Sequence, residues 1–270
     1  MSGIGQSHGC ISVINGIVNG KGAVIGINLL TEAAFTERDA EPFVNVIGEE
    51  TDDTLARICV RRTLERIGRN PNIGYLLTIK SEIPPSRGLK SSSSVCNAVI
   101  AAVLDAYGVE MDEMEMVKLG VECAKEAKVT VTGSFDDACG CQFGGLIFTN
   151  NYENRVLSRG PIGDYDVIIC TPGYTKRKVP KEEYQAVASE MEEIQRIAKE
   201  DPLRALTLNG RLIARVTGEG TELIDMAMEA GALAAGISGT GPAVAVVCEK
   251  GKGKTISEKL PCDTIVTETR

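Results

Sequence analysis

Apolar residues follow one another in β-type runs near the start of the chain. The stretches Ile11–Val18 and Ala23–Ala34 are rich in Val, Ile and Ala, and Asn19-Gly20-Lys21-Gly22 separates them. An Asn-Gly step between two such runs is a strong signal for a hairpin. The sequence therefore predicts two antiparallel strands whose connecting turn carries Lys21 at its tip.

Helical spacing of apolar residues appears twice in the next hundred positions. One predicted helix covers Thr51–Gly68, and a second covers Asp112–Lys128, where Asp112 is the cap and Glu115 stands three residues later. Between these helices, Ile73–Lys80 is a β-type run that leads into a loop rich in Pro, Gly and Ser. The expected order is thus strand, loop and helix.

The loop after this strand carries the most informative pattern in the chain. Residues 83–94 read Ile-Pro-Pro-Ser-Arg-Gly-Leu-Lys-Ser-Ser-Ser-Ser, and the following apolar residues recur at helical spacing. The first N–H groups of a helix lack internal partners and carry the positive end of its dipole, which suits a phosphate. A serine cluster before a helix is often only a cap, but four hydroxyls exceed that need, and Arg87 and Lys90 add positive charge. We therefore expect an anion-binding loop.

A second polar segment precedes the strand expected at Leu146–Thr149. Here Asp136 and Asp137 follow a Thr/Gly/Ser-rich stretch, and Gly144-Gly145 comes soon after them. The two aspartates are consistent with a simple helix cap. They are equally consistent with a metal ligand and a proton acceptor for phosphoryl transfer. The double glycine slightly favours the functional interpretation, because it suggests a tightly packed site.

After residue 150 the pattern changes to shorter elements, which suggests a boundary between an N-terminal lobe (1–158) and a C-terminal lobe (159–270). A glycine-rich turn, Ser238–Pro242, separates two apolar runs near the end of the chain. The expected strands are Arg155–Leu157, Asp166–Cys170, Ala232–Ile237, Ala243–Cys248 and Thr264–Thr267, and the expected helices are Lys181–Lys199, Pro202–Gly218, Thr221–Glu229 and Lys252–Lys259.

Composition narrows the kinds of partner. A net charge of −8 over 270 residues argues against a nucleic-acid surface, so small molecules are the expected partners. The nine cysteines form no C-x-x-C pair, and Cys139-Gly140-Cys141 has an unusual spacing for zinc. Free buried thiols in a reducing cytoplasm explain them better. No stretch has the roughly 20 apolar residues of a membrane span, and no secretion signal is evident.

Three segments together resemble the GHMP kinase superfamily, which includes galactokinases, homoserine kinases, mevalonate kinases and phosphomevalonate kinases. Residues 83–94 match its phosphate-binding motif, residues 133–138 with 143–145 are similar to its aspartate-bearing segment, and residues 236–242 are similar to its C-terminal glycine-rich loop. Lys90, the four serines and the Phe-Asp-Asp-Ala stretch resemble the archaeal type of shikimate kinase within this superfamily.

The resemblance implies a two-lobed α+β fold with mixed and antiparallel sheets and a nucleotide site between the lobes. It implies transfer of the ATP γ-phosphate to the 3-hydroxyl of shikimate, in aromatic amino-acid biosynthesis, with Mg²⁺ as a companion of ATP. The residues implied to bind the nucleotide are Pro85, Ser86, Arg87, Gly88, Leu89, Lys90, Ser91, Ser92, Ser93, Ser94, Gly239 and Gly241.

The resemblance also implies roles for particular side chains. Ser92 and Glu126 match the family's Mg²⁺ ligands, and either Asp136 or Asp137 matches its catalytic aspartate. The family's first motif is a poor match, because residues 9–15 lack the usual Pro-Gly followed by a basic residue. Lys21 is the expected replacement for that basic residue. Shikimate carries a carboxylate that needs a nearby cation, for which Lys21, Arg87 and Lys90 are the alternatives.

Two other functions remain open at this point. Another GHMP kinase, such as a homoserine kinase, would share the fold and the nucleotide site but phosphorylate a different alcohol. A non-catalytic nucleotide-binding regulator would bind the nucleotide without turning over any acceptor. The paired aspartates count mildly against the regulator.

Overall fold

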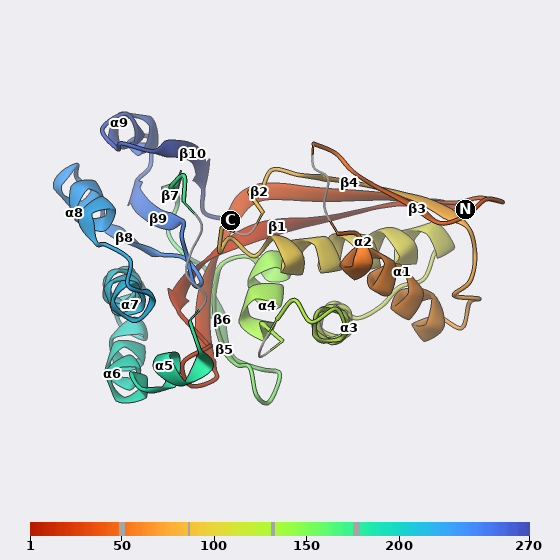
Figure 1. Cartoon of the computed structure of the whole chain (residues 1–270), viewed down its shortest axis with the longest axis horizontal. Helices are drawn as coiled ribbons and strands as arrows, with labels where there is room; N and C mark the ends of the chain where they lie inside the picture. The colour runs from red at the N-terminus through yellow and green to blue at the C-terminus, as the bar shows by residue number, and fades with distance from the viewer. Residues whose placement is uncertain (49–51, 86, 131–132, 175–178) are drawn as a thin grey trace.

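The fold is built from two β-sheets with helices packed on them, in an elongated molecule (Figure 1). A computed structural model describes residues 1–48, 52–85, 87–130, 133–174 and 179–270. One sheet is mixed and the other antiparallel, so the predicted α+β class with two lobes is confirmed. None of the described helices is long and apolar enough to cross a bilayer.

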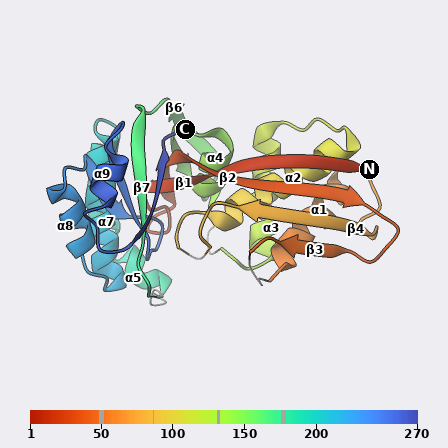
Figure 2. The ribbon, with the colours of Figure 1, turned by 90° about the horizontal axis from the view of Figure 1, so that it is seen from above.

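The first sheet is organised around β2, a strand of 17 residues. Strand β1 lies along one edge of β2, while β4 and β5 share its other edge, and Figure 2 shows β1, β2, β4 and β3 side by side. The predicted hairpin is confirmed, but β1 ends at Ile14, before the expected Val18, and the connection covers residues 15–20, so Lys21 is the first residue of β2 and does not stand at the tip of the turn. The strands are β1 (Ser2–Ile14), β2 (Lys21–Glu37), β3 (Phe43–Val46), β4 (Tyr75–Ser81), β5 (Leu146–Asn150) and β6 (Arg155–Gly160).

Four helices cover one face of this sheet: α1 (Thr54–Arg66), α2 (Ser91–Tyr107), α3 (Glu113–Glu126) and α4 (Phe135–Phe143). Helix α2 approaches β1 closely because that strand has glycines facing it. A Cβ at Gly3 would lie 2.2 Å from the Ala106 nitrogen, and a Cβ at Gly5 would lie 2.1 Å from the Ala98 oxygen. The helix therefore runs antiparallel to β1, and its first turn lies toward the centre of the molecule (Figure 1).

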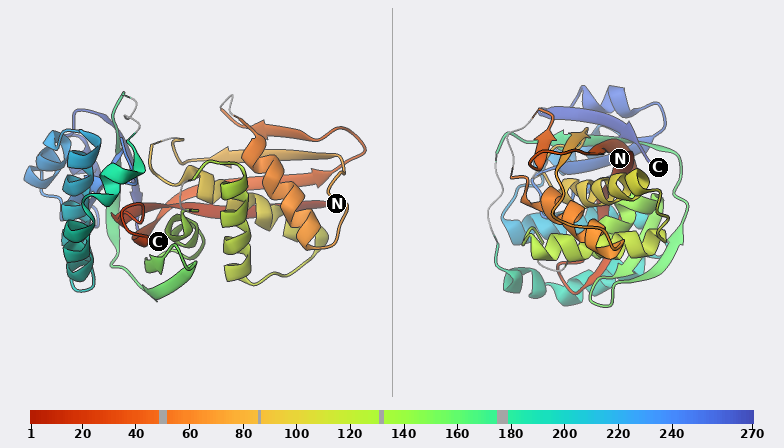
Figure 3. Two further views of the ribbon diagram at one scale, coloured as in Figure 1. Left: turned by 60° about the horizontal axis from the view of Figure 1, so that its bottom comes forward. Right: turned by 90° about the vertical axis from the view of Figure 1, so that its right-hand side faces the viewer.

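The second sheet has the strand order β10-β7-β9-β8 and is antiparallel. Its helices gather at the other end of the molecule, where they appear in teal and blue in Figure 3. The strands are β7 (Tyr165–Thr171), β8 (Ala234–Ile237), β9 (Val244–Glu249) and β10 (Asp263–Glu268), and the helices are α5 (Lys181–Gln185), α6 (Ala188–Ala198), α7 (Pro202–Thr217), α8 (Glu222–Glu229) and α9 (Gly253–Ser257).

One predicted helix is divided in two, and the predicted lobe boundary lies inside a strand. The helix expected at Lys181–Lys199 is two helices, because Val187 leaves the helical conformation (φ −101°, ψ 18°) between α5 and α6. The lobe boundary expected between residues 158 and 159 falls within β6, which belongs wholly to the first sheet. The ends of β1 and β2 share a hydrophobic core with the second sheet, so the two halves are packed together.

Candidate active site

A cavity of about 610 Å³ opens where segments from both halves of the chain meet. The phosphate-type loop, the β1–β2 turn, the connection between α3 and α4 and the glycine-rich loop all contribute to it. The described lining residues are Ser12, Asn15, Gly16, Ile17, Gly88, Leu89, Lys90, Ser91, Ser92, Ser93, Ala124, Lys128, Val129, Thr130, Ser134, Asp136, Asp137, Asn151, Gly239 and Thr240.

The start of α2 forms one wall of this cavity. Gly88 has a positive φ of 83°, and a Cβ there would lie 2.2 Å from the Ser238 oxygen, so the loop passes tightly under the glycine-rich turn. Residues 91–93 line the cavity, and the side chain of Lys90, the N-cap residue of α2, makes no capping hydrogen bond. Its first N–H groups are thus available to an anion, as the sequence predicted.

Other predicted nucleotide-binding residues lie outside the cavity. Pro85, Ser94 and Gly241 do not line it, although Gly239 does, and Ser86 lies outside the described residues. Arg87 does not line the cavity either. Its guanidinium donates to the carbonyl oxygens of Pro172 (2.8 Å) and Tyr174 (3.0 Å), and its own carbonyl accepts from the Ala243 N–H at 3.2 Å. Arg87 therefore ties the loop to the second sheet.

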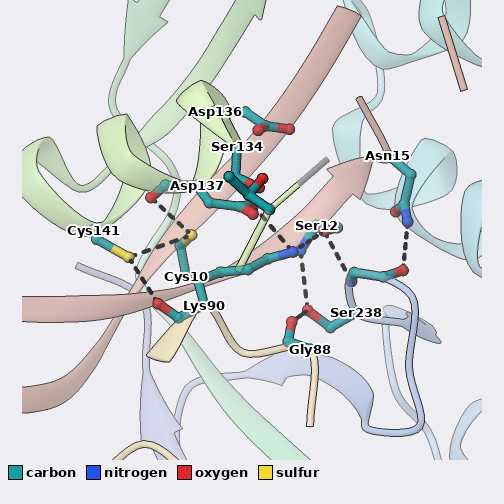
Figure 4. Close-up of polar contacts among 12 residues, drawn as sticks. Cys10, Ser12, Asn15, Gly88, Lys90, Ser134, Asp136, Asp137, Cys141 and Ser238 are labelled. Carbon is teal, nitrogen blue, oxygen red and sulfur yellow. Dashed lines mark hydrogen bonds and ion pairs between the residues drawn. The ribbon is translucent and has the colours of Figure 1, made fainter. Parts of the chain in front are cut away.

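Lys90 brings a buried positive charge to the cavity. Its ammonium lies 3.1 Å from Asp137 Oδ1 and donates to Ser12 Oγ at 2.9 Å, and Figure 4 shows the side chain reaching between these two residues. Only 7% of the Lys90 side chain and 16% of the Asp137 side chain are exposed. Burial, the largest single effect, lowers the pKa of Lys90, but the charge and hydrogen bond of Asp137 together with the influence of Cys10 and Asp136 outweigh it, so the net shift of the Lys90 pKa is upward. The ammonium stays charged.

Two thiols lie beneath this ion pair. Cys10 Sγ contacts the Asp137 carbonyl oxygen at 3.6 Å, Cys141 Sγ contacts the Lys90 carbonyl oxygen at 3.9 Å, and the two sulfur atoms are 3.9 Å apart. Burial, followed by the contact with Cys141, raises the pKa of Cys10 well above its usual value. Both residues are free thiols, as the sequence predicted. Both side chains are buried, so they form a packed floor beneath the pair.

Asp136 is separated from Lys90 and held by Asn151. The Asn151 side-chain amide donates to Asp136 Oδ1 at 2.8 Å, and its oxygen accepts from the Asp136 N–H at 3.0 Å. Gly22 leaves room for the other carboxylate oxygen, because a Cβ at Gly22 would lie 2.1 Å from Asp136 Oδ2. Burial, with the charge of Asp137 second, raises the pKa of Asp136 to about 7. The adjacent aspartates therefore differ: Asp137 is paired with a cation, and Asp136 titrates near neutrality.

Lys21 does not take part in this cluster. Successive side chains of a strand point to opposite faces, and Gly22 is the β2 residue that faces Asp136. Lys21 consequently projects from the other face, where its side chain is exposed and its carbonyl oxygen accepts from Gln195. Lys21 does not line the cavity, where Lys90 is the buried cation beside Asp137, and a catalytic role for Lys21 stays a prediction.

The predicted metal ligands are not brought together. Ser92 lines the cavity, but the Glu126 carboxylate pairs with Arg61 and, at 3.7 Å, with Arg62 of α1. Ala124 of α3 lines the cavity, and Glu126 lies about 200° around the helix from it. Within the described ranges no cluster of three His, Cys, Asp or Glu side chains suits a metal ion. The Ser92–Glu126 pair therefore does not fit Mg²⁺ here.

Several lining residues had no sequence signal. Ser12 Oγ accepts from both the Lys90 ammonium and the Gly239 N–H (3.0 Å), and the Asn15 amide donates to the Gly239 carbonyl oxygen. Asn15 also exchanges two hydrogen bonds with Asn209 of α7, at 3.0 and 3.1 Å. These contacts join β1 to the glycine-rich loop across more than 190 positions of sequence, a separation that local patterns do not reveal.

The arrangement has the components of phosphoryl transfer to a hydroxyl. A helix start with free N–H groups suits the phosphates, and a carboxylate beside it can orient a hydroxyl or accept its proton.

Solved structures share the fold at low sequence identity. The mevalonate kinase of Methanococcus jannaschii has a TM-score of 0.80 and 19% identity, covering 99% of this chain and 98% of its own. The homoserine kinase of Cytophaga hutchinsonii has a TM-score of 0.71 and 17% identity, covering 99% and 94%.

Sequence comparisons identify nearer relatives. A protein of Pyrococcus furiosus named shikimate kinase is 35% identical, over all of both chains. Proteins with the same name from Methanothrix thermoacetophila and Thermococcus kodakarensis are 37% and 38% identical, over 96% and 90% of this chain and 89% and 90% of their own lengths. The profile described as GHMP kinases N terminal domain matches residues 54–145, and the one described as GHMP kinases C terminal matches residues 185–265. Together with the phosphate-type loop and the aspartate that faces it, these matches show that the chain belongs to the GHMP kinase family.

Proposed function

We propose that the chain is an ATP-dependent kinase that phosphorylates the 3-hydroxyl of shikimate. Relatives named shikimate kinase, 35–38% identical over 90–100% of the chain, support the choice of acceptor. The observation that carries the chemical proposal is the Lys90–Asp137 pair, which stands beside the start of α2 inside one cavity.

The β- and γ-phosphates of ATP are proposed to lie against the first turn of α2. Residues 91–93 of that turn line the cavity, and Gly239 and Thr240 line it from the glycine-rich loop of the other lobe. Such a preorganised set of donors stabilises charge as it develops during transfer. Mg²⁺ is proposed as the companion of ATP, where it would shield the charge of the phosphates.

Asp137 is the proposed partner of the acceptor hydroxyl. Its carboxylate faces the cavity beside the start of α2, and Lys90 holds it in place at 3.1 Å. The hydroxyl oxygen forms a bond to the γ-phosphorus while the bond from phosphorus to the ADP oxygen breaks, and the hydroxyl proton passes to the carboxylate. Asp136, held by Asn151, is proposed to position the acceptor side of the cavity.

A coupled assay of ADP release with a panel of alcohols tests this function. Shikimate, homoserine, mevalonate and galactose are supplied one at a time with ATP and Mg²⁺, and kcat/KM is compared. Shikimate is expected to exceed each of the others by at least about 100-fold, because a site built to bind a substrate's polar groups rejects analogues that lack them. A higher kcat/KM for another alcohol refutes the choice of acceptor, and nucleotide binding without turnover on any alcohol refutes the kinase.

The same assay with Asp137→Asn and Asp136→Asn assigns the aspartates. Asp137→Asn is expected to lower kcat by roughly 10²–10⁴-fold, the usual contribution of a positioned acid or base. Asp136→Asn is expected to lower it less, since an amide can still accept from Asn151. The reverse ranking would exchange the two roles.

A further inference from the structure

The carboxylate of the acceptor needs a positively charged partner. Among the described lining residues of the cavity, one lysine is free to take this role. Shikimate is an anion, and a carboxylate leaving water without a charged partner is costly. Lys21 projects from the other face of β2, and Arg87 is bound to two carbonyl oxygens of the segment that follows β7. Lys90 is already paired with Asp137. Among the described lining residues, this leaves Lys128, which forms no ion pair with any described residue and has an exposed side chain.

The backbone at Lys128 is unusual for a lysine. Lys128 follows the end of α3 with φ +57°, and the Lys128 and Val129 N–H groups bond back to the carbonyl oxygens of Lys125 and Ala124. This helix ending requires a left-handed residue and favours glycine. Three of the four described non-glycine residues with positive φ (Lys90, Lys128 and Ser134) line this one cavity. Strained residues gather at functional sites, and the helix ending by itself would favour glycine over lysine here.

We propose that Lys128 binds the carboxylate of the anionic acceptor and so determines acceptor specificity. This inference rests on the proposed kinase function and extends it to a residue of the acceptor subsite. The nucleotide phosphates have the start of α2 and its serines as partners, whereas the acceptor carboxylate has no other uncommitted cation in the described cavity. Thr130 and Ser134, whose hydroxyls are 2.9 Å apart, line the same side of the cavity.

Lys128→Gly tests the proposal, because it removes the ammonium and also relieves the strained backbone. The thermal midpoint of this variant is expected to equal or exceed that of the unaltered protein. Its KM for shikimate is expected to rise roughly 10- to 100-fold, the usual range for a charge-assisted hydrogen bond, while its KM for ATP changes less than about twofold. Lys128→Arg restores the charge, and Lys118→Ala, at an exposed α3 lysine outside the cavity, is the matched control.

The methyl ester of shikimate separates charge recognition from a general loss of fit. The unaltered protein is expected to prefer shikimate to the ester, and Lys128→Gly is expected to lose that preference. An unchanged KM for shikimate, an equal rise for acid and ester, or a rise confined to ATP overturns the proposal. If the protein phosphorylates only another acceptor, shikimate is not its substrate. The KM values of the unaltered protein and of Lys128→Gly are then compared for that acceptor and for its neutral derivative. If it phosphorylates no alcohol, the binding of shikimate to the unaltered protein and to Lys128→Gly is measured by calorimetry, and equal affinities overturn the proposal.

Discussion

Replacement of Lys90 by methionine tests the centre of the proposed site. The substitution keeps the length of the side chain and removes its charge. At an effective dielectric constant of about 20, unit charges separated by the 3.1 Å between Lys90 Nζ and Asp137 Oδ1 attract by roughly 5 kcal/mol. Desolvation offsets part of this attraction, but removing one partner of a buried pair leaves the other charge uncompensated, at a cost of about 3–5 kcal/mol.

A double-mutant cycle isolates the interaction. Lys90→Met, Asp137→Asn and the double variant are unfolded in urea beside the unaltered protein, and the coupling free energy is expected to be about 3 kcal/mol. Kinetics separate two roles for the lysine. If Lys90 acts through Asp137, Lys90→Met lowers kcat by roughly 10²-fold and leaves KM for ATP within about fivefold. If Lys90 instead binds the phosphates, KM for ATP rises and kcat changes little.

Two results would refute the reasoning about the pair. A coupling free energy below about 0.5 kcal/mol would mean that the two charges act independently. Normal turnover by Lys90→Met would remove the lysine from the mechanism, whatever its effect on stability. Lys118→Met is the control, because this lysine is exposed on α3 and does not line the cavity.

Three further predictions concern neighbouring residues. Because folding raises the pKa of Asp136 from its ordinary 3.8 to about 7, the folded protein holds this proton more tightly than the unfolded chain, and the free energy of unfolding falls as pH rises from about 4 to 7. Asp136→Asn should flatten that fall in urea titrations at pH 5 and 8, and an unchanged slope contradicts the assignment. Glu126→Gln should change kcat less than about threefold, since its partners are surface arginines, whereas a hundredfold loss would restore it as a metal ligand. Gly22→Ala should lower kcat about tenfold or more, because the new Cβ would lie 2.1 Å from Asp136 Oδ2; unchanged activity would show that this carboxyl can move freely.

Features with a local signal could be predicted from the sequence. The Asn19-Gly20 step marked the hairpin, and the Gly88 turn followed by serines marked the start of α2. Asp112 caps α3 as expected, since its side chain accepts from the N–H groups of residues 114 and 115. The resemblance of three motifs to one superfamily predicted the fold class and the cavity between the lobes.

The pairing of side chains across the site could not be predicted. Lys90 meets Asp137 and Ser12 only after the first sheet and α4 are packed together, and no local pattern encodes those partners. Lys21 was assigned by its place at a turn, but the alternation of β2 directs Gly22, not Lys21, toward the aspartates. Glu126 was predicted as a metal ligand from its motif, but it lies on the side of α3 where its carboxylate pairs with arginines of α1.

The anchoring of the phosphate-type loop has a consequence for how the protein can be divided. Arg87 bonds to carbonyl oxygens of residues 172 and 174, its own carbonyl accepts from residue 243, and the Gly88 carbonyl accepts from the Ser238 hydroxyl at 3.0 Å. The phosphate-type loop is therefore held in place by residues that come much later in the sequence. A fragment that stops after β6 would keep the phosphate-type loop and both aspartates, but it would lack the glycine-rich loop and the contacts that hold the phosphate-type loop in place.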